Sequence, residues 1–119
     1  MDITQTKRGP VLFFELTGPL TANDAQAFVD SLPSNPHYGR VAGILVHLQK
    51  IEWKLSASEI ESLARTAQLR PIHWAIVAEG DYSFGVAQQF VRQAQKGPIF
   101  KTFKDEESAI QWLLAPAIS

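Results

Sequence analysis

The stretch that most constrains the fold of this chain is residues 40–63. It opens with an apolar run at residues 41–46, which contains no charged residue. Such runs are typical of a strand that is buried on both faces of a parallel sheet. Further on, Ser56 precedes Glu59 by three residues, and this pair forms a capping box that begins a helix. The stretch therefore predicts a central strand that leads through a short loop, residues 49–55, into a capped helix.

Short apolar segments between turn residues predict four more strands. They lie at residues 3–6, 11–17, 72–78 and 99–103. The first two are joined by so few residues that we expect an antiparallel hairpin, and Gly18 with Pro19 should end the second strand.

Polar capping residues predict helices between the later strands. Thr21 caps a helix over residues 22–32, Asp81 or Ser83 caps a third helix that ends at Gly97 and Pro98, and Asp105 caps the last. Alternation of helix and strand requires mostly parallel pairing with right-handed crossovers. We therefore expect an α/β fold with one mixed, mostly parallel sheet of four or five strands. It should be opened by a β-hairpin and covered by about four helices, in one domain over residues 1–119 with a frayed tail at 115–119.

The predicted core lies where the apolar faces of these elements meet. The strands at residues 41–48 and 72–78 should be adjacent and parallel at the centre of the sheet. Four side chains on apolar faces should be almost fully buried: Leu45, Ile76, Phe90 and Trp112.

Composition limits the classes of function. Lysine and arginine number 11, aspartate and glutamate 12, and the formal net charge is −1, so we expect no nucleic-acid partner. The absence of cysteine excludes disulfides, thiolate metal sites and a cysteine nucleophile, and it agrees with a cytoplasmic location, which we expect. No apolar run approaches the length of about 18 residues that a membrane span needs, and the first residues lack the pattern of a signal peptide.

No group of residues in the sequence has the spacing of a catalytic motif. There is no Gly-x-Ser-x-Gly elbow, and the glycine pair at residues 80 and 85 lacks the Lys-Ser that follows in a phosphate-binding loop. The three histidines, His37, His47 and His73, fall on a loop and two different strands. His47 and His73 could approach each other if their strands pair, but nothing else in reach completes a metal or acid–base site. We therefore expect no catalytic residue, no metal site and no cofactor.

Apolar and aromatic side chains gather after the two central strands. Ile51, Trp53 and Leu55 follow the first of them, and Tyr82 and Phe84 follow the next. Because the carboxyl ends of parallel strands meet at one edge of a sheet, these five side chains should lie close together. Two interpretations remain open: a small satellite core under the loop, or a groove for an apolar ligand or a partner protein.

The order of elements and two local stretches resemble the STAS fold of the anti-sigma-factor antagonists, and more narrowly its SpoIIAA-like branch. One stretch is the strand at residues 44–48 followed by a loop and Ser56. The other contains Phe-Gly-Val-Ala at residues 84–87 with Phe90, then Phe-Lys-Asp at 103–105, Ala109 and Trp-Leu at 112–113. By element order, the resemblance covers nearly the whole chain.

The resemblance also implies a modification site. In antagonists of this family, a partner kinase phosphorylates a serine at the start of the helix after the central strand. Ser56 stands at that position, and Ser58 offers a second hydroxyl two residues on. The sequence departs from the family motif at Leu55, where the family has aspartate, at Ser58, where it has glycine, and at His47, where it has an acidic residue. Ser56 is thus either a phospho-acceptor or a plain helix cap.

Three hypotheses for the function follow. The resemblance and the lack of a catalytic motif favour a non-enzymatic STAS-like regulatory or protein-interaction module, which works through a protein partner or through self-association, for instance as a homodimer. The alternative is a protein that binds a small apolar, lipid-like ligand in a groove at the carboxyl edge of the sheet, by analogy with the fold class. An enzyme is the least favoured of the three.

Overall fold

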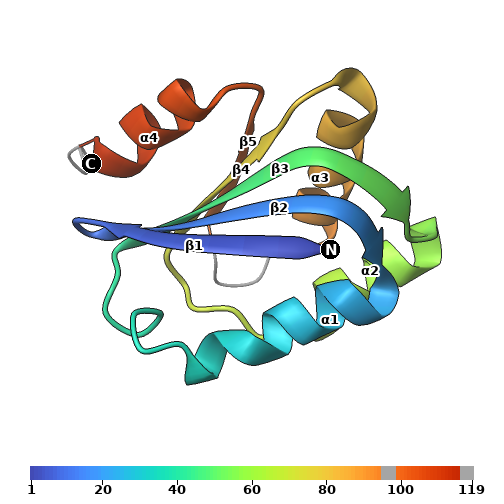
Figure 1. Ribbon diagram of the computed structural model, residues 1–119, viewed down its shortest axis with the longest axis horizontal. Coiled ribbons are helices and arrows are strands. Elements are labelled where there is room, and N and C mark those ends of the chain that lie inside the picture. Colours follow the sequence, from blue (N-terminus) through green and yellow to red (C-terminus); the bar gives the residue numbers. More distant parts are fainter. Residues whose placement is uncertain (95–98, 116–119) are drawn as a thin grey trace.

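Five strands form one mixed sheet in the computed structural model, which describes residues 1–94 and 99–115 (Figure 1). The strands are β1 (Asp2–Arg8), β2 (Val11–Thr21), β3 (Gly43–Lys54), β4 (His73–Ala78) and β5 (Ile99–Phe103), and they lie in the sheet in this order. β1 and β2 form an antiparallel hairpin, whereas the remaining neighbours pair in parallel. The sheet predicted from the sequence, with its two adjacent central strands, is confirmed.

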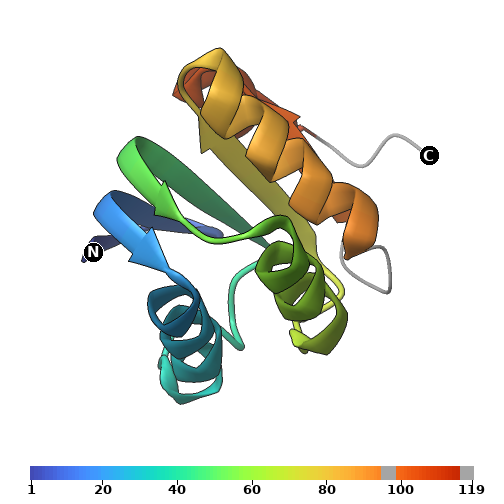
Figure 2. The ribbon, with the colours of Figure 1, turned by 90° about the vertical axis from the view of Figure 1, so that its right-hand side faces the viewer.

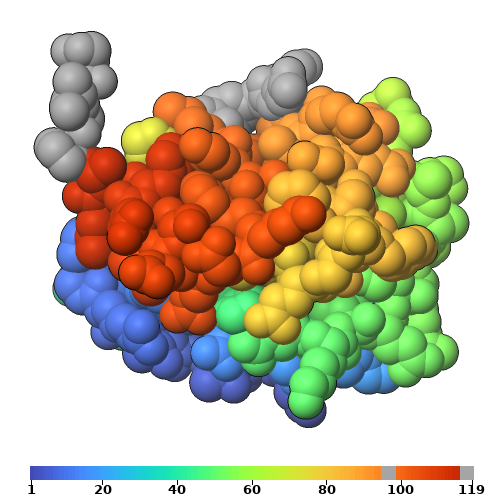
Figure 3. All heavy atoms as spheres, turned by 90° about the horizontal axis from the view of Figure 1, so that it is seen from above, coloured from blue at the N-terminus to red at the C-terminus, as the bar shows by residue number. Residues whose placement is uncertain are grey.

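Helices cover both faces of the sheet. They are α1 (Ala22–Ser31), which continues into the short 3-10 helix η1 (Leu32–Ser34), α2 (Ala57–Thr66), α3 (Asp81–Gln93) and α4 (Glu106–Leu114). α1, α2 and α3 pack on one face, with α2 in contact with both of its neighbours (Figure 2). α4, red in the space-filling view, covers the other face (Figure 3). The described helices therefore match the predicted number and order.

Three of these helices begin at the capping residue that the sequence predicts. In each case the cap's side-chain oxygen accepts a hydrogen bond from the backbone N–H three residues on: Thr21 from Asp24, Ser56 from Glu59, and Asp105 from Ser108. These bonds satisfy donors that a helix start leaves free. In α1 and α2 the third residue's carboxylate also accepts from the N–H of the cap, which completes a capping box.

The start of α3 differs from the prediction. Gly80 is the N-cap, it makes no side-chain hydrogen bond, and Asp81 is already the first residue of the helix, so the predicted cap at Asp81 or Ser83 is wrong. Gly80 has a φ of +86°, a conformation that glycine adopts without steric cost. The chain passes from β4 into α3 through this residue.

β2 and β3 are longer than predicted. Gly18 and Pro19 do not end β2, which continues to Thr21. Residues 49–54 form the last part of β3 instead of a loop, and they pair with the extension of β2. Turn residues show where a chain can bend, but they do not show whether a neighbouring strand will hold it extended.

The paired extensions cross a β-bulge at Lys50. Gln49 lies opposite Thr17 and Ile51 lies opposite Gly18, so Lys50 has no residue opposite it in the ladder. Lys50 has a φ of 49° and Gly18 a φ of +88°, both in the left-handed region. A bulge bends the strand and increases its twist. Beyond this point both strands bend toward α1 and α2, as Figure 1 shows.

The predicted core is half right. Leu45 and Ile76 are buried in the central strands, as expected. Phe90 and Trp112 are only half-buried, so the prediction that they are almost fully enclosed is wrong. Phe90 faces an open pocket instead of a filled core. Trp112 packs against His73 and Phe103, with ring centroids 4.9 Å and 5.7 Å apart, and it remains half-buried near the end of α4.

Two expectations concern residues outside the described part of the chain. The predicted end of the third helix at Gly97 and Pro98 lies there, as does the predicted frayed tail beyond residue 115. Among the residues that are described, no helix is long and apolar enough to cross a membrane.

Replacement of Leu45 by alanine tests the central packing. Leu45 is 0% exposed, and its loss should lower the free energy of unfolding by about 2–5 kcal/mol, because it leaves a cavity between β3 and α4. Leu114→Ala is the matched control, since Leu114 is 54% exposed, and it should change the stability by less than ~0.5 kcal/mol. Urea denaturation measures both values. Equal losses for the two variants would contradict the assignment of the core.

The helix caps should make the stability sensitive to acid. The backbone N–H of Thr21 lowers the pKa of Asp24, and the backbone N–H of Ser108 lowers that of Asp105. Because the folded pKa values are depressed, this stabilisation is present above the ordinary aspartate value of about 3.9 and is lost as the pH falls below it. Asp105→Ala should therefore lower the melting temperature at neutral pH and lower it less in strong acid. A difference that is the same at both pH values would argue against the carboxylate as the stabilising group.

Candidate functional site

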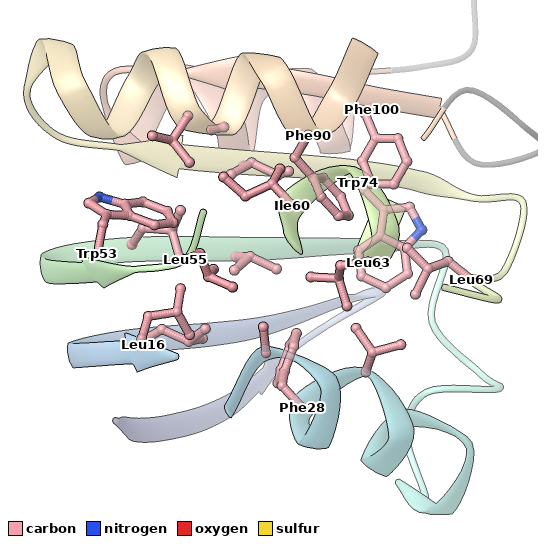
Figure 4. Close-up of a pocket in the computed structure, with 18 of the residues that line it drawn as sticks. Leu16, Phe28, Trp53, Leu55, Ile60, Leu63, Leu69, Trp74, Phe90 and Phe100 are labelled. Carbon is pink, nitrogen blue, oxygen red and sulfur yellow. The ribbon is translucent and has the colours of Figure 1, made fainter. Parts of the chain in front are cut away.

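An apolar pocket lies between the sheet and the helices α1, α2 and α3 (Figure 4). Its cavity volume is about 120 Å³. In the described part of the chain, only apolar and aromatic side chains line it; they include Leu16, Phe28, Ile60, Leu63, Trp74, Phe90 and Phe100. The pocket is thus a gap inside the larger hydrophobic cluster of the molecule.

Local sequence patterns explain why these side chains point into the pocket. Along β3 and β4, alternate residues face the same side of the sheet, which brings Val46 and Trp74 to the pocket floor. Along α2, Ile60 and Leu63 are three residues apart and lie on one helix face. Figure 4 shows Phe28 entering from α1 on the other side. The helices therefore form walls around a space that their side chains do not fill.

The described part of the pocket wall has no free polar group to anchor a ligand. Two tryptophans contribute to it, but the indole N–H of Trp53 donates to Ser83 Oγ at 2.8 Å and that of Trp74 donates to the Arg70 carbonyl at 3.1 Å. Among the described lining residues there is also no titratable side chain. The pocket can bury an apolar group, but it offers neither a nucleophile nor a general acid or base.

The five residues predicted to form a groove are divided by the structure. Trp53 and Leu55, at and just after the end of β3, line the pocket. Ile51 and Phe84 pack from outside against the same hydrophobic cluster. Tyr82 is 71% exposed and stands on the surface at the start of α3. The carboxyl edge of the sheet thus provides one rim of the pocket, and Tyr82 lies beyond it.

The start of α2 exposes the two candidate phospho-acceptors. Ser56 and Ser58 are both exposed, and their hydroxyl oxygens are 3.2 Å apart. Ser56 Oγ accepts the Glu59 N–H at 3.1 Å, and Glu59 Oε1 accepts the Ser56 N–H at 2.9 Å. Ser56 is therefore a helix cap in this structure, and its hydroxyl can still be reached from solvent.

A buried histidine with acidic neighbours lies on the opposite face of the sheet. His47 on β3 is 4% exposed; its Nδ1 is 3.0 Å from Glu106 Oε2, and its Nε2 is 3.5 Å from Glu79 Oε1. Nε2 is buried and, although Glu79 lies near it, has no hydrogen-bond partner among the described residues. The sequence showed Glu106 only as a favourable charge in the first turn of a helix. Its contact with His47 depends on how α4 crosses the sheet.

The other two histidines lie elsewhere. β3 and β4 are adjacent, but their register pairs His47 with Val77 and His73 with Gly43, so the two strand histidines are at different ends of the pair. His37 lies in the loop after η1. Within residues 1–94 and 99–115, no three His, Asp or Glu side chains are placed to hold a metal ion.

Comparison with known proteins relates the fold to solved structures. No protein family profile and no curated protein matches the sequence. The structure is similar to that of an uncharacterised protein with a SpoIIAA-like fold from Shewanella loihica PV-4. The two share 22% sequence identity, the match covers 94% of this chain and 92% of that one, and the TM-score is 0.56.

Two structures of SpoIIAA are also similar. The anti-sigma factor antagonist SpoIIAA in its unphosphorylated form shares 16% identity over 97% of this chain and 100% of that one, with a TM-score of 0.58. The Bacillus cell fate determinant SpoIIAA in its phosphorylated form shares 13% identity over 94% and 99%, with a TM-score of 0.51. At these identities the similarity concerns the fold, and it extends over almost the whole chain. The chain has the α/β fold of the SpoIIAA-like, STAS-type proteins.

Proposed function

We propose that the protein is a non-enzymatic regulatory module of the STAS type, which works through a protein partner or through self-association. The observation that carries this proposal is the start of α2, where two exposed serine hydroxyls lie side by side on a SpoIIAA-like fold. One of the similar structures is of SpoIIAA in its phosphorylated form. The absence of reactive side chains from the described wall of the pocket is in keeping with a role other than catalysis.

A phosphate at the start of α2 would have two opposing effects. Free backbone N–H groups and the helix dipole favour an anion at this position. The Glu59 carboxylate, however, already accepts the Ser56 N–H at 2.9 Å and would repel a phosphate on Ser56. Phosphorylation should therefore break the capping box and loosen the first turn, while the local surface becomes strongly negative. Both changes would alter the affinity of a partner that docks on α2.

The first test of this proposal is a search for the modification. The protein is incubated with ATP and a lysate of its own host, and modified residues are mapped by mass spectrometry. Phosphate should appear at Ser56 or Ser58, because both hydroxyls are exposed next to a helix start. The variant Ser56→Ala/Ser58→Ala is the control and should stay unmodified. Modification only at other serines would place the regulated surface elsewhere.

The second test concerns partner affinity. Ser56→Asp should change the affinity of a partner captured from the host by about tenfold, the effect of roughly 1.4 kcal/mol from one added charge at an interface. Ser31→Asp and Ser108→Asp add the same charge on α1 and α4 and serve as matched controls. Calorimetry on the three variants measures the constants. Equal changes for all three would leave Ser56 as a helix cap only.

The apolar pocket favours a second candidate function, the binding of a small apolar ligand. A closed apolar cavity of about 150 Å³ is enough to hold a molecule of the size of benzene. The pocket here, about 120 Å³ with an opening to solvent, is of the same order. A ligand with a longer chain or a polar head would have to extend through the opening, since the described wall offers no polar partner.

Filling the pocket tests this second function. Ala25 lines the pocket, and Ala25→Leu adds three carbon atoms to its interior. Ala57 is exposed at the start of α2, so Ala57→Leu is a matched control outside the pocket. Native mass spectrometry of protein purified from its host should show an added small mass on the unsubstituted chain and on Ala57→Leu, and much less of it on Ala25→Leu. An unliganded mass for all three proteins would speak against this function.

A further inference from the structure

We propose that β1 is the surface through which two copies of this chain pair, edge to edge and antiparallel, to continue the sheet across a twofold axis. β1 is an edge strand, and all seven of its residues are exposed. Within the described part of the chain, β2 is the only strand that pairs with it (Figure 1). Its outer side therefore presents a row of backbone N–H and C=O groups, which is a ready template for another strand.

The other edge of the sheet is less suited to such pairing. β5 has five residues against seven in β1, and both α3 and α4 pack against it. Helices cover β1 less than they cover β5: among the strands, α1 packs mainly against β2, and all seven residues of β1 are exposed. Because β1 buries no side chain, what it offers a partner is mainly the backbone N–H and C=O groups of its outer edge.

The charges of β1 are complementary to a second, antiparallel copy of the same strand. Asp2 and Arg8 stand at its two ends and, being six residues apart, lie on the same face. If two copies pair around Gln5, Asp2 of each lies opposite Arg8 of the other, and Thr4 lies opposite Thr6. Opposite charges and threonine pairs directly across two strands are favourable. A twofold axis makes each of these contacts twice.

The same charges disfavour the parallel arrangement. In a parallel, in-register pair, Asp2 would face Asp2 and Arg8 would face Arg8, with repulsion at both ends. Lysine and arginine on an edge strand commonly protect it from unspecific pairing. Here Lys7 and Arg8 disfavour the in-register parallel partner and leave the antiparallel one, so the charge pattern favours one orientation of the pair.

The side chains concerned are available for this contact. Arg8 is 58% exposed; its guanidinium lies over the Phe13 ring, 4.6 Å from the centroid, and 3.8 Å from Glu106. These contacts hold it on the α4 face of the sheet, which is also the face of Asp2 by the register with β2. At the centre of the pair, the Gln5 side chain already accepts a hydrogen bond from the Asn35 side chain of its own copy, at 2.7 Å. The two copies would therefore be joined there by backbone hydrogen bonds.

This inference deepens the proposed function, because it names the surface that self-association would use. It can fail separately from that proposal. The serines at the start of α2 are outside β1, and their modification is read by mass spectrometry, whereas pairing through β1 is read from the mass of the assembly in solution.

The experiment is a charge exchange followed by sedimentation equilibrium, from micromolar to millimolar protein. The unsubstituted chain should show a concentration-dependent monomer–dimer equilibrium that weakens with added salt. Asp2→Arg and Arg8→Asp each turn two attractive pairs into two repulsive ones and should weaken the dimer by about tenfold or more. Arg92→Asp, an exposed charge change on α3, is the control and should leave the equilibrium unchanged.

Mixing the two variants provides the decisive measurement. In an equimolar mixture, Arg at position 2 of one chain meets Asp at position 8 of the other, and the unchanged Arg8 meets the unchanged Asp2, so dimers should reappear. The double variant Asp2→Arg/Arg8→Asp should dimerise on its own for the same reason. Circular dichroism checks that each variant is folded. If Arg8→Asp does not fold, Arg8→Gln takes its place in the measurement of lost affinity, because it puts no acid beside Glu106. Any of three results would overturn the inference. The unsubstituted chain could stay monomeric at every concentration, the single variants could dimerise as the unsubstituted chain does, or the mixture of folded variants could form no dimers.

Discussion

β2 and β3 pair in parallel from Val11 opposite Gly43 to Thr21 opposite Lys54, and the rest of the structure depends on this ladder. It joins the hairpin to the central strands, so the sheet is continuous. It also brings the ends of two strands side by side, and each strand leads directly into a helix capped by a hydroxyl: Thr21 for α1 and Ser56 for α2. The directions of both helices across the sheet are thus determined by one run of backbone hydrogen bonds.

The bulge within this ladder has a consequence for the candidate site. Without the extra residue Lys50, the side chains after it would fall on the other face of the sheet, because side-chain direction alternates along a strand. With it, Leu20 and Trp53 lie opposite each other and both line the pocket. Trp53 in turn donates to Ser83, which links the end of β3 to α3. The rim of the pocket is therefore built on paired strands instead of a free loop.

The two faces of the sheet are packed in different ways. On the α4 face a compact cluster packs around Leu45 and Ala109, and the one buried polar side chain among the described residues, His47, contacts carboxylates there. On the other face three helices surround an unfilled apolar space. A cavity costs stability when side chains do not fill it, because its lining loses dispersion contacts. The proposed functions, partner binding at α2 and ligand binding beneath it, both use this less completely packed side.

The sequence by itself determined the features that depend on near neighbours. The caps at Thr21, Ser56 and Asp105 bond residues three apart, and the apolar run of β3 shows burial on both faces, so three helix starts, the adjacent central strands and the α/β class could be predicted. Only the tertiary structure decided how far β3 extends, because pairing with β2 keeps residues 49–54 in a strand across the bulge at Lys50. It also decided that Phe90 faces a cavity and that His47 meets Glu106, 59 residues further along the chain. These features depend on the distances between packed elements, and a pattern of apolar and polar residues records which face of an element is turned inward but not how closely it approaches the next.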